Sequence, residues 1–224
     1  YLIYISQAAQ GDFGESIRWK TPAMGLILDR FPNTLLLSAS AIFFGICLAI
    51  PVGVVSAVKR GTLFDSVGKV VALIGQSMPS FWIGILLIMA FALYLPIFPT
   101  SGIGTAAHLV LPSLTLGSYV AASMMRVTRS AMLDALDADY VRTARSKGVS
   151  EWRVIWKHAF RNAATPVLTI TALEAANILR GAVITETVFA WPGIGKLAVD
   201  AVYARDFPLV QAAVLFMGLV FLGI

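Results

Sequence analysis

The stretch DYVRTARSKGVSEWRVIWKHAFRN, residues 139–162, is strongly basic within a sequence that is otherwise mostly apolar. Six of its residues are Lys or Arg, and two tryptophans lie among them. Of the 224 residues in the chain, 58% are hydrophobic and only 13% are charged, whereas soluble globular domains have about 25% charged residues. With a mean hydropathy of +0.81, the composition is typical of a membrane protein, so the basic stretch is expected to be a loop between membrane spans.

Five apolar segments are candidate membrane spans. They are residues 34–58, 68–96, 109–125, 163–185 and 207–224. Pro and Gly inside such spans are tolerated because neighbouring helices satisfy the freed backbone groups. The predicted fold class is therefore all-α, a polytopic transmembrane helical bundle, with buried helices of a soluble protein as the alternative. The last 16 residues give about 24 Å of helix against a bilayer core of about 30 Å. We therefore expect a fragment that lacks residues at both ends.

The basic residues are unevenly distributed among the loops. Residues 59–69 carry three Lys or Arg and residues 126–161 carry eight, so two loops on the same side hold 11 of the 17 basic residues. On the opposite side, residues 97–107 carry none and residues 186–206 carry two. The positive-inside rule makes the first pair of loops cytoplasmic. A multi-pass protein of the bacterial cytoplasmic membrane is therefore predicted.

Residues 1–33 are then expected to form an extracytoplasmic segment, followed by a transmembrane domain over residues 34–224. Thr21 is a candidate N-cap and Pro22 suits the first helical position. Apolar residues follow at the spacing of an amphipathic helix: Met24, Ile27, Leu28 and Phe31. Such a helix either lies at the outer membrane interface or packs against another span.

The basic stretch itself is predicted to contain two short helices. Asp139 caps the first helix, which runs to about Lys147, and Gly148 supplies the left-handed residue that ends it. Val149 is placed to contact Ala144 in the usual hydrophobic closure. Ser150 caps the second helix.

The second helix presents two faces. Its apolar face consists of Trp152, Ile155, Trp156 and Ala159, and its basic face of Arg153, Lys157 and Arg161. Basic residues beside tryptophans suit an anionic cytoplasmic leaflet, which makes membrane lipid a partner. The pattern also fits a DNA-binding helix-turn-helix or a simple solvated loop. A DNA reader needs a third packed helix and free access to a duplex, so no nucleic acid is expected as a partner.

The sequence of residues 139–169 resembles the cytoplasmic coupling loop, or EAA motif, of ABC importer permeases. The resemblance extends to RVTRSAMLDALDADY before it and to GAVITETVFAWPGIGKLAVDAVYARDFPLVQ after it. Upstream, GDFGESI, RFPNTLLLSASA, IPVGVVSAVKRGTLFD and SMPSFWIGILL are similar to the dipeptide/oligopeptide/nickel permease family. The general motif Glu-Ala-Ala-x-x-x-Gly is replaced by Arg142-Thr143-Ala144-x-x-x-Gly148, a variant usual in the peptide branch.

This resemblance implies a type I ABC importer permease fold, with an earlier first span and the end of the last span missing here. It implies a subunit that couples ATPase movement to alternating access, most simply for di- or oligopeptides, with nickel or another small solute as the alternative. The implied partners are a second homologous permease subunit, two cytoplasmic ATP-binding subunits and an extracytoplasmic binding protein. No cofactor is expected in this chain, since the partner subunits bind ATP and Mg. A secondary transporter that works without ATP is the alternative from another class.

The coupling loop implied by the resemblance spans about residues 137–161. Its candidate ATPase contacts are Tyr140, Arg142, Thr143, Ala144, Lys147, Gly148, Ser150 and Trp152. A contact that bears force needs a short helix, apolar anchors and a rigid turn, and this loop offers all three.

Catalytic motifs are not found, so no enzyme activity is predicted. The segment WPGIGK, residues 191–196, resembles the end of a phosphate-binding loop, but Ala190 and Leu197 occupy positions that require Gly and Ser or Thr. The segment GQSMP has Pro79 where a nucleophile elbow needs Gly. His108 and His158 are far apart in the sequence, and Cys47 is the single cysteine, so neither a metal site nor an intrachain disulfide is expected.

One carboxylate falls near the middle of the fourth apolar segment. Glu174 has Asn177 and Gly181 on the same helical face, and Arg180 lies nearby. A carboxylate at this depth costs roughly 2.5–3.5 kcal/mol to insert, so it should face a partner or water. Glu174, Asn177 and Arg180 are therefore candidate pathway-lining residues, with a structural Glu–Arg pair or hydrogen bond as the alternative.

Overall fold

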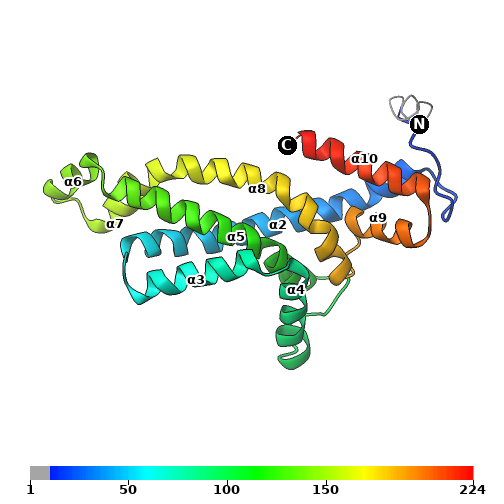
Figure 1. The fold of residues 1–224 in the computed structure, drawn as a ribbon, viewed down its shortest axis with the longest axis horizontal. Helices are drawn as coiled ribbons and strands as arrows, with labels where there is room; N and C mark the ends of the chain where they lie inside the picture. The colour runs from blue at the N-terminus through cyan, green and yellow to red at the C-terminus, as the bar shows by residue number, and fades with distance from the viewer. Residues whose placement is uncertain (1–10, 224) are drawn as a thin grey trace. The chain divides into compact units, whose positions relative to one another are not determined.

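The computed structural model describes residues 11–223, and this part of the chain is built from helices (Figure 1). In chain order they are α2 (Ala23–Val58), α3 (Leu63–Ser77), α4 (Ser80–Ile88), η1 (Met89–Tyr94), α5 (Ala106–Leu136), α6 (Asp139–Ser146), α7 (Glu151–Arg153), η2 (Val154–Ala159), α8 (Phe160–Val188), α9 (Ile194–Tyr203) and α10 (Phe207–Gly223). The η segments are π-helical. No β-strand occurs among the described residues, so the all-α prediction is confirmed.

The chain divides into two compact units. Among the described residues, the first consists of residues 11–40, Ser80–Leu116 and residues 176–223. Its core contains Phe13, Ala23, Ile27, Ile194, Leu197, Ala198, Ala201, Leu209, Ala212 and Ala213. The second consists of Ala41–Pro79 and Gly117–Ala175. Its core, called here the loop core, contains Val54, Ala57, Met132, Ala135, Val141, Ala144, Val154, Ala159 and Ala163.

Helix α2 joins two segments that the sequence analysis separated. It is a single helix of 36 residues, so the predicted domain boundary at residue 33 lies inside it, and the predicted amphipathic helix forms the first turns of this longer helix. Ala23 and Ile27, one turn apart, are fully buried against residues of α9 and α10. Met24 and Phe31 of the predicted stripe pack partly buried against the same core, whereas Leu28 is exposed. Most of the stripe therefore packs against other helices, which is the second of the two predicted arrangements.

The predicted span of residues 68–96 is broken. Helix α3 ends at Ser77, and Met78 has an extended backbone (φ −82°, ψ 136°) before α4 begins at Ser80. Pro79 explains the break, because a proline disfavours the helical conformation of the residue before it and has no N–H to donate.

Within residues 11–223, two helices are long and apolar enough to cross a membrane: Ala23–Val58 and the continuous helix Glu151–Val188. Helix α3 and α4–η1 meet the same criteria only together, as a broken span or a re-entrant loop. Helix α10 is apolar but has 17 residues, whereas α5 has 31 residues and is less apolar. The predicted segments 109–125 and 163–185 thus lie inside longer helices.

Candidate functional site: the basic helical loop

Helix α6 ends in the glycine turn that the sequence predicts. Lys147 is the C-cap, and Gly148 follows with φ +73° in the left-handed region. The N–H of Val149 donates to the carbonyl of Ala144 (3.2 Å) and that of Gly148 to the carbonyl of Arg145 (2.9 Å). These two bonds are the Schellman pattern, so the turn satisfies the carbonyls at the end of α6 and fixes the direction of the chain.

The helix starts differ in part from the prediction. Ala138 is the N-cap of α6, with an extended backbone (φ −74°, ψ 150°), so the prediction of Asp139 as cap is wrong by one residue. Asp139 is instead the first helical residue, where its negative charge interacts favourably with the positive end of the helix dipole. Its carboxylate lies 3.5 Å from the guanidinium of Arg142. Ser150 is the N-cap of α7 as predicted, but its hydroxyl makes no capping hydrogen bond.

The second predicted helix continues into α8 through the π-helical turn η2. Together α7, η2 and α8 form one helix of 38 residues. The wide turn places Val154 and Ala159, five residues apart, in the loop core, and both are fully buried. The predicted apolar face is confirmed for Ala159, which is buried, and for Ile155 and Trp156, which pack partly buried against the loop core. It is wrong for Trp152, which is 71% exposed.

An ion pair across the glycine turn was missed by the sequence analysis. The guanidinium of Arg145 donates to both carboxylate oxygens of Glu151, at 2.9 and 3.2 Å. Both side chains are largely exposed, so the pair contributes little stability, and it joins the end of α6 to the first residue of α7 across the turn. Opposite charges on the two sides of a predicted turn were the signal available in the sequence.

The basic helical loop, residues 137–161, packs on the ends of α2 and α5. Val141 and Ala144 of α6 pack in the loop core with Val54 and Ala57 of α2 and with Met132 and Ala135 of α5. Ala144 therefore faces inward. The other candidate ATPase contacts are exposed: Tyr140, Arg142, Thr143, Lys147, Gly148, Ser150 and Trp152. Figure 1 shows α6 and α7 at one end of α5.

The three candidate pathway residues lie on α8 but do not share a face. Glu174 is 4% exposed, and its Oε2 has no hydrogen-bond partner among the described residues. Asn177 and Arg180 are exposed. Six residues turn a helix by about 240°, so Glu174 and Arg180 point in different directions, and no ion pair joins them within residues 11–223.

Arg180 instead lies over an aromatic ring. Its guanidinium is 4.5 Å from the ring centroid of Phe221 on α10. A groove of about 340 Å³ between α8 and α10 is lined by Arg180, Phe221 and apolar residues such as Val214 and Met217. A cation in this position is available to an anionic group that enters the groove.

The segment WPGIGK encloses a carboxylate of the chain itself. Glu186, near the end of α8, is fully buried and accepts hydrogen bonds from Thr34 Oγ1 (2.7 Å) and from the N–H of Lys196 (3.0 Å). Helix α9 begins at Ile194, so Lys196 lies in its first turn, where N–H groups favour an anion. The Glu186 carboxylate is therefore the anion at the N-terminus of α9.

A second buried carboxylate anchors the segment before α2. Burial by itself raises the pKa of Asp206, but hydrogen bonds from the Ser16 hydroxyl and from the N–H groups of Ile17, Arg18 and Leu209 outweigh it and lower the pKa below its ordinary value. Asp206 thus holds the segment around Ser16 against the start of α10.

Residues 49–224 match the family model described as binding-protein-dependent transport system inner membrane component. The chain is 42% identical to the di/tripeptide transport system permease protein DppB of Pseudomonas aeruginosa, with 97% of this chain and 73% of that protein covered. It is 40% identical to the dipeptide permease DppB of Escherichia coli K12, with the same shares covered. It is 43% identical to the glutathione permease GsiC of that strain, with 98% and 72% covered.

Solved structures with low sequence identity share the fold. An inward-facing structure of the MetNI methionine ABC transporter matches with a TM-score of 0.73 at 16% identity, covering 88% of this chain and 90% of that one. An amino acid ABC transporter with histidines matches with a TM-score of 0.68 at 15% identity, and 89% of each chain is covered. The helical arrangement is therefore that of a type I ABC importer permease.

Proposed function

This chain belongs to the family of binding-protein-dependent transport system inner membrane components, and on that premise we propose that it carries short peptides. It is the transmembrane permease subunit of an ATP-driven importer in the bacterial cytoplasmic membrane. The observation that supports peptides as substrates is the identity of 40–43% to permeases named for di/tripeptides, dipeptides and glutathione, over nearly the whole chain.

The proposed complex contains this chain, a second homologous permease subunit, two ATP-binding subunits and a binding protein. The ATP-binding subunits hold ATP and Mg, and this chain contributes no catalytic group. Residues 137–161 face the cytoplasm in this arrangement, and the segment before α2 faces the other side. The distribution of basic residues among the loops supports this orientation.

The basic helical loop is the proposed contact with an ATP-binding subunit. Its exposed residues combine aromatic anchors, Tyr140 and Trp152, with the cations Arg142 and Lys147, so the matching groove should be apolar with acidic residues at its rim. Because α6 packs on the ends of α2 and α5, closure of the ATP-binding subunits would displace these helices and change access to the pathway.

Glu174, Asn177 and Arg180 are proposed to line the pathway in the assembled permease pair. The support is the buried carboxylate of Glu174, whose Oε2 lacks a hydrogen-bond partner among the described residues, and the exposed guanidinium of Arg180, which lies over the Phe221 ring beside a groove. A peptide has an ammonium group at one end and a carboxylate at the other, so Glu174 could attract the first and Arg180 the second.

Reconstitution tests this function. The four membrane-associated subunits in proteoliposomes, supplied with binding protein, ATP and a radiolabelled dipeptide, should show uptake that requires every component. Ni²⁺ uptake is measured in parallel with the same vesicles. Uptake by the permease pair without ATP-binding subunits, or uptake of Ni²⁺ but not of peptide, would contradict the proposal.

A further inference from the structure

A buried carboxylate joins three helices of the second unit. Asp65, in the first turn of α3, is 1% exposed. It accepts two hydrogen bonds from the Arg129 guanidinium of α5, at 2.7 and 2.9 Å. It also accepts bonds from the Ser56 hydroxyl of α2 (2.7 Å) and from the N–H of Gly61 in the α2–α3 turn (3.1 Å). Lys69 adds a more exposed contact at 3.3 Å.

These partners lie on the two helices that support the basic helical loop. Val54, Ala57 and Met132 belong to the loop core. Ser56 lies between the first two on α2, and Arg129 lies one turn before Met132 on α5. Helix α3 contributes no residue to that core as described. The carboxylate of Asp65 is thus a polar connection from α3 to the helices on which α6 rests.

The apolar contact between α3 and α5 is formed mainly by small residues of α3. Helix α3 presents small residues toward α5: Gly68, Ala72 and Gly75. A Cβ atom at Gly68 would lie 3.0 Å from the Met125 methyl carbon, and one at Gly75 would lie 3.5 Å from Ala122. Such a seam permits close approach but has few interlocking side chains, so it resists sliding of α3 along α5 only weakly.

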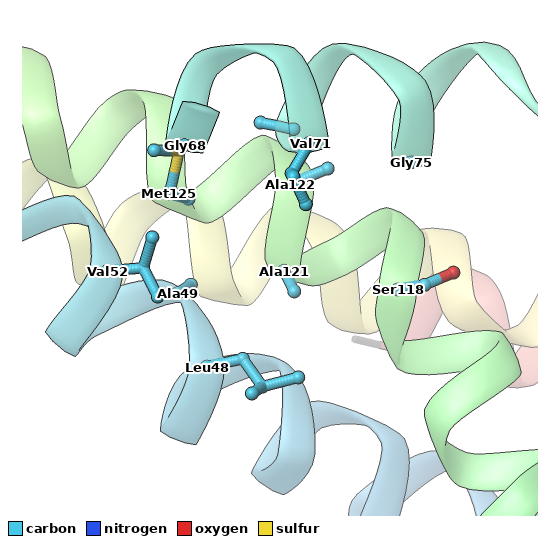
Figure 2. A pocket seen from close by; sticks show the side chains of 11 residues that line it. Leu48, Ala49, Val52, Gly68, Val71, Gly75, Ser118, Ala121, Ala122 and Met125 are labelled. Atoms are coloured by element: carbon cyan, nitrogen blue, oxygen red, sulfur yellow. The ribbon is translucent and has the colours of Figure 1, made fainter. Parts of the chain in front are cut away.

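A groove beside this seam reduces the interlocking further. It has a volume of about 250 Å³ and lies between α2, α3 and α5. Figure 2 shows Leu48 and Val52 of α2 on one side of it and Gly68 and Val71 of α3 on the other. The side chains of α2 therefore leave α3 partly unsupported along this edge.

We propose that the Asp65–Arg129 ion pair fixes the register of α3 on α5, so that α3 moves together with the basic helical loop when the ATP-binding subunits close. The inference rests on the proposed function of that loop. Asp65 and Arg129 are positioning residues, since they act through the helices and do not contact substrate.

The geometry supports such a lock. Both bonds of the Arg129 fork are shorter than 3 Å, and a helix shift of about 1–2 Å, typical of switching proteins, would break at least one of them. Separation would leave a buried charge without its partner, which is strongly unfavourable. The two helices therefore move as one body while the pair is intact.

The test uses the complete transporter with Asp65→Asn and, separately, Arg129→Lys. Asn retains the shape of the side chain but removes its charge, and Lys retains the charge but removes the fork. Uptake per ATP hydrolysed should fall about five-fold or more in Asp65→Asn and less in Arg129→Lys, in the range of measured coupling effects. ATP hydrolysis stimulated by the binding protein should continue, and melting temperatures report stability.

Arg60→Ala is the matched control, because it removes an exposed pair with Asp137 at 3.9 Å from the same turn; its uptake per ATP should be unchanged. Normal coupling in both test variants would overturn the proposal. So would parallel losses of thermal stability, ATP hydrolysis and uptake, which indicate a structural role alone. If Asp65→Asn does not fold, Arg129→Lys decides. Failure of the proposed function itself would appear separately, as absent ATP-dependent uptake in the wild type.

Discussion

The hydroxyl of Thr34 donates a 2.7 Å hydrogen bond to the carboxylate of Glu186 and accepts a 2.9 Å bond from the N–H of Ile194. One threonine on α2 therefore links the end of α8 to the beginning of α9. The neighbouring Asn33 adds to this link, because its carbonyl accepts a bond from the Trp191 indole (2.9 Å). The turn between α8 and α9 is fixed mainly by these buried polar contacts.

Gly193→Ala should destabilise this turn. A Cβ atom at Gly193 would overlap the carboxylate of Glu186, and forcing extra atoms into a packed site costs about 1–3 kcal/mol. The thermal unfolding of the detergent-solubilised protein should shift to a lower temperature. Gly218→Ala is the control, since nothing lies within 4 Å of its added Cβ; an equal loss in both variants would show that the Glu186 contact is not the cause.

Gly148→Leu should weaken attachment of the ATP-binding subunits without preventing membrane insertion. The left-handed backbone at φ +73° costs a side-chain-bearing residue about 1–2 kcal/mol, and the turn direction would change to relieve it. Co-purification with the ATP-binding subunits and uptake should both fall. Gly148→Asn, which tolerates this conformation better, should retain most of both. Normal co-purification by the Leu variant would reject the assigned contact.

The orientation can be measured by cysteine labelling in a Cys47→Ser background. Ser150 and Ser101 are both exposed, and the distribution of basic residues predicts that they lie on opposite sides of the membrane. A membrane-impermeant maleimide should label Ser101→Cys in intact cells and Ser150→Cys only after permeabilisation. Labelling of both positions in intact cells would overturn the predicted orientation.

Glu174→Gln should lower uptake while assembly and ATP hydrolysis remain. The amide keeps the shape of the side chain and removes its charge, and within residues 11–223 Glu174 forms no ion pair with Arg180 that the change could break. The melting temperature should therefore not fall, because burying a neutral amide costs less than burying a carboxylate. A melting temperature that falls in proportion to uptake would make Glu174 a structural residue.

Asp206 should make stability depend on pH on the acid side. Folding lowers its pKa, so the carboxylate adds stability above its unfolded pKa of about 4, and this contribution is lost as the pH falls through the lower folded pKa. The difference in melting temperature between wild type and Asp206→Asn should be largest near pH 6 and should shrink below about pH 4. Glu15→Gln, at an exposed carboxylate of the same segment, is the control. A difference that does not vary with pH would contradict this account.

The helices were predictable from the sequence where local chemistry determines them. A helix that ends near Lys147 favours a left-handed residue directly after it, and Gly148 adopts that conformation. Helix lengths were less predictable. Helix α2 begins at Ala23, before the predicted span that starts at residue 34, because Ala23 and Ile27 pack against α9 and α10. Such partners are distant in the sequence, and periodicity alone does not identify them.

The candidate site was predictable as a segment but not in its detailed contacts. The residues of the basic helical loop were identified by type and spacing, yet the π-helical turn adds Val154 to the buried face, while Trp152 is exposed. Nothing in an α-helical pattern signals the extra residue in such a turn. Likewise, the pairing of Asp65 with Arg129, 64 residues apart, depends on the packing of α3 on α5.

Because the helix from Glu151 to Val188 is unbroken, the number of residues between Trp152 and Glu174 determines the angle between the directions of their side chains about the helix axis. Each residue added between them would rotate one side chain relative to the other by about 100° and separate them by a further 1.5 Å. A single-residue insertion there would aim Glu174 at a different neighbour while leaving every motif intact. A related sequence that has both residues in the same arrangement must therefore have the same number of residues between them. The loop before α5 is not helical, so a change in its length would not rotate side chains in this way.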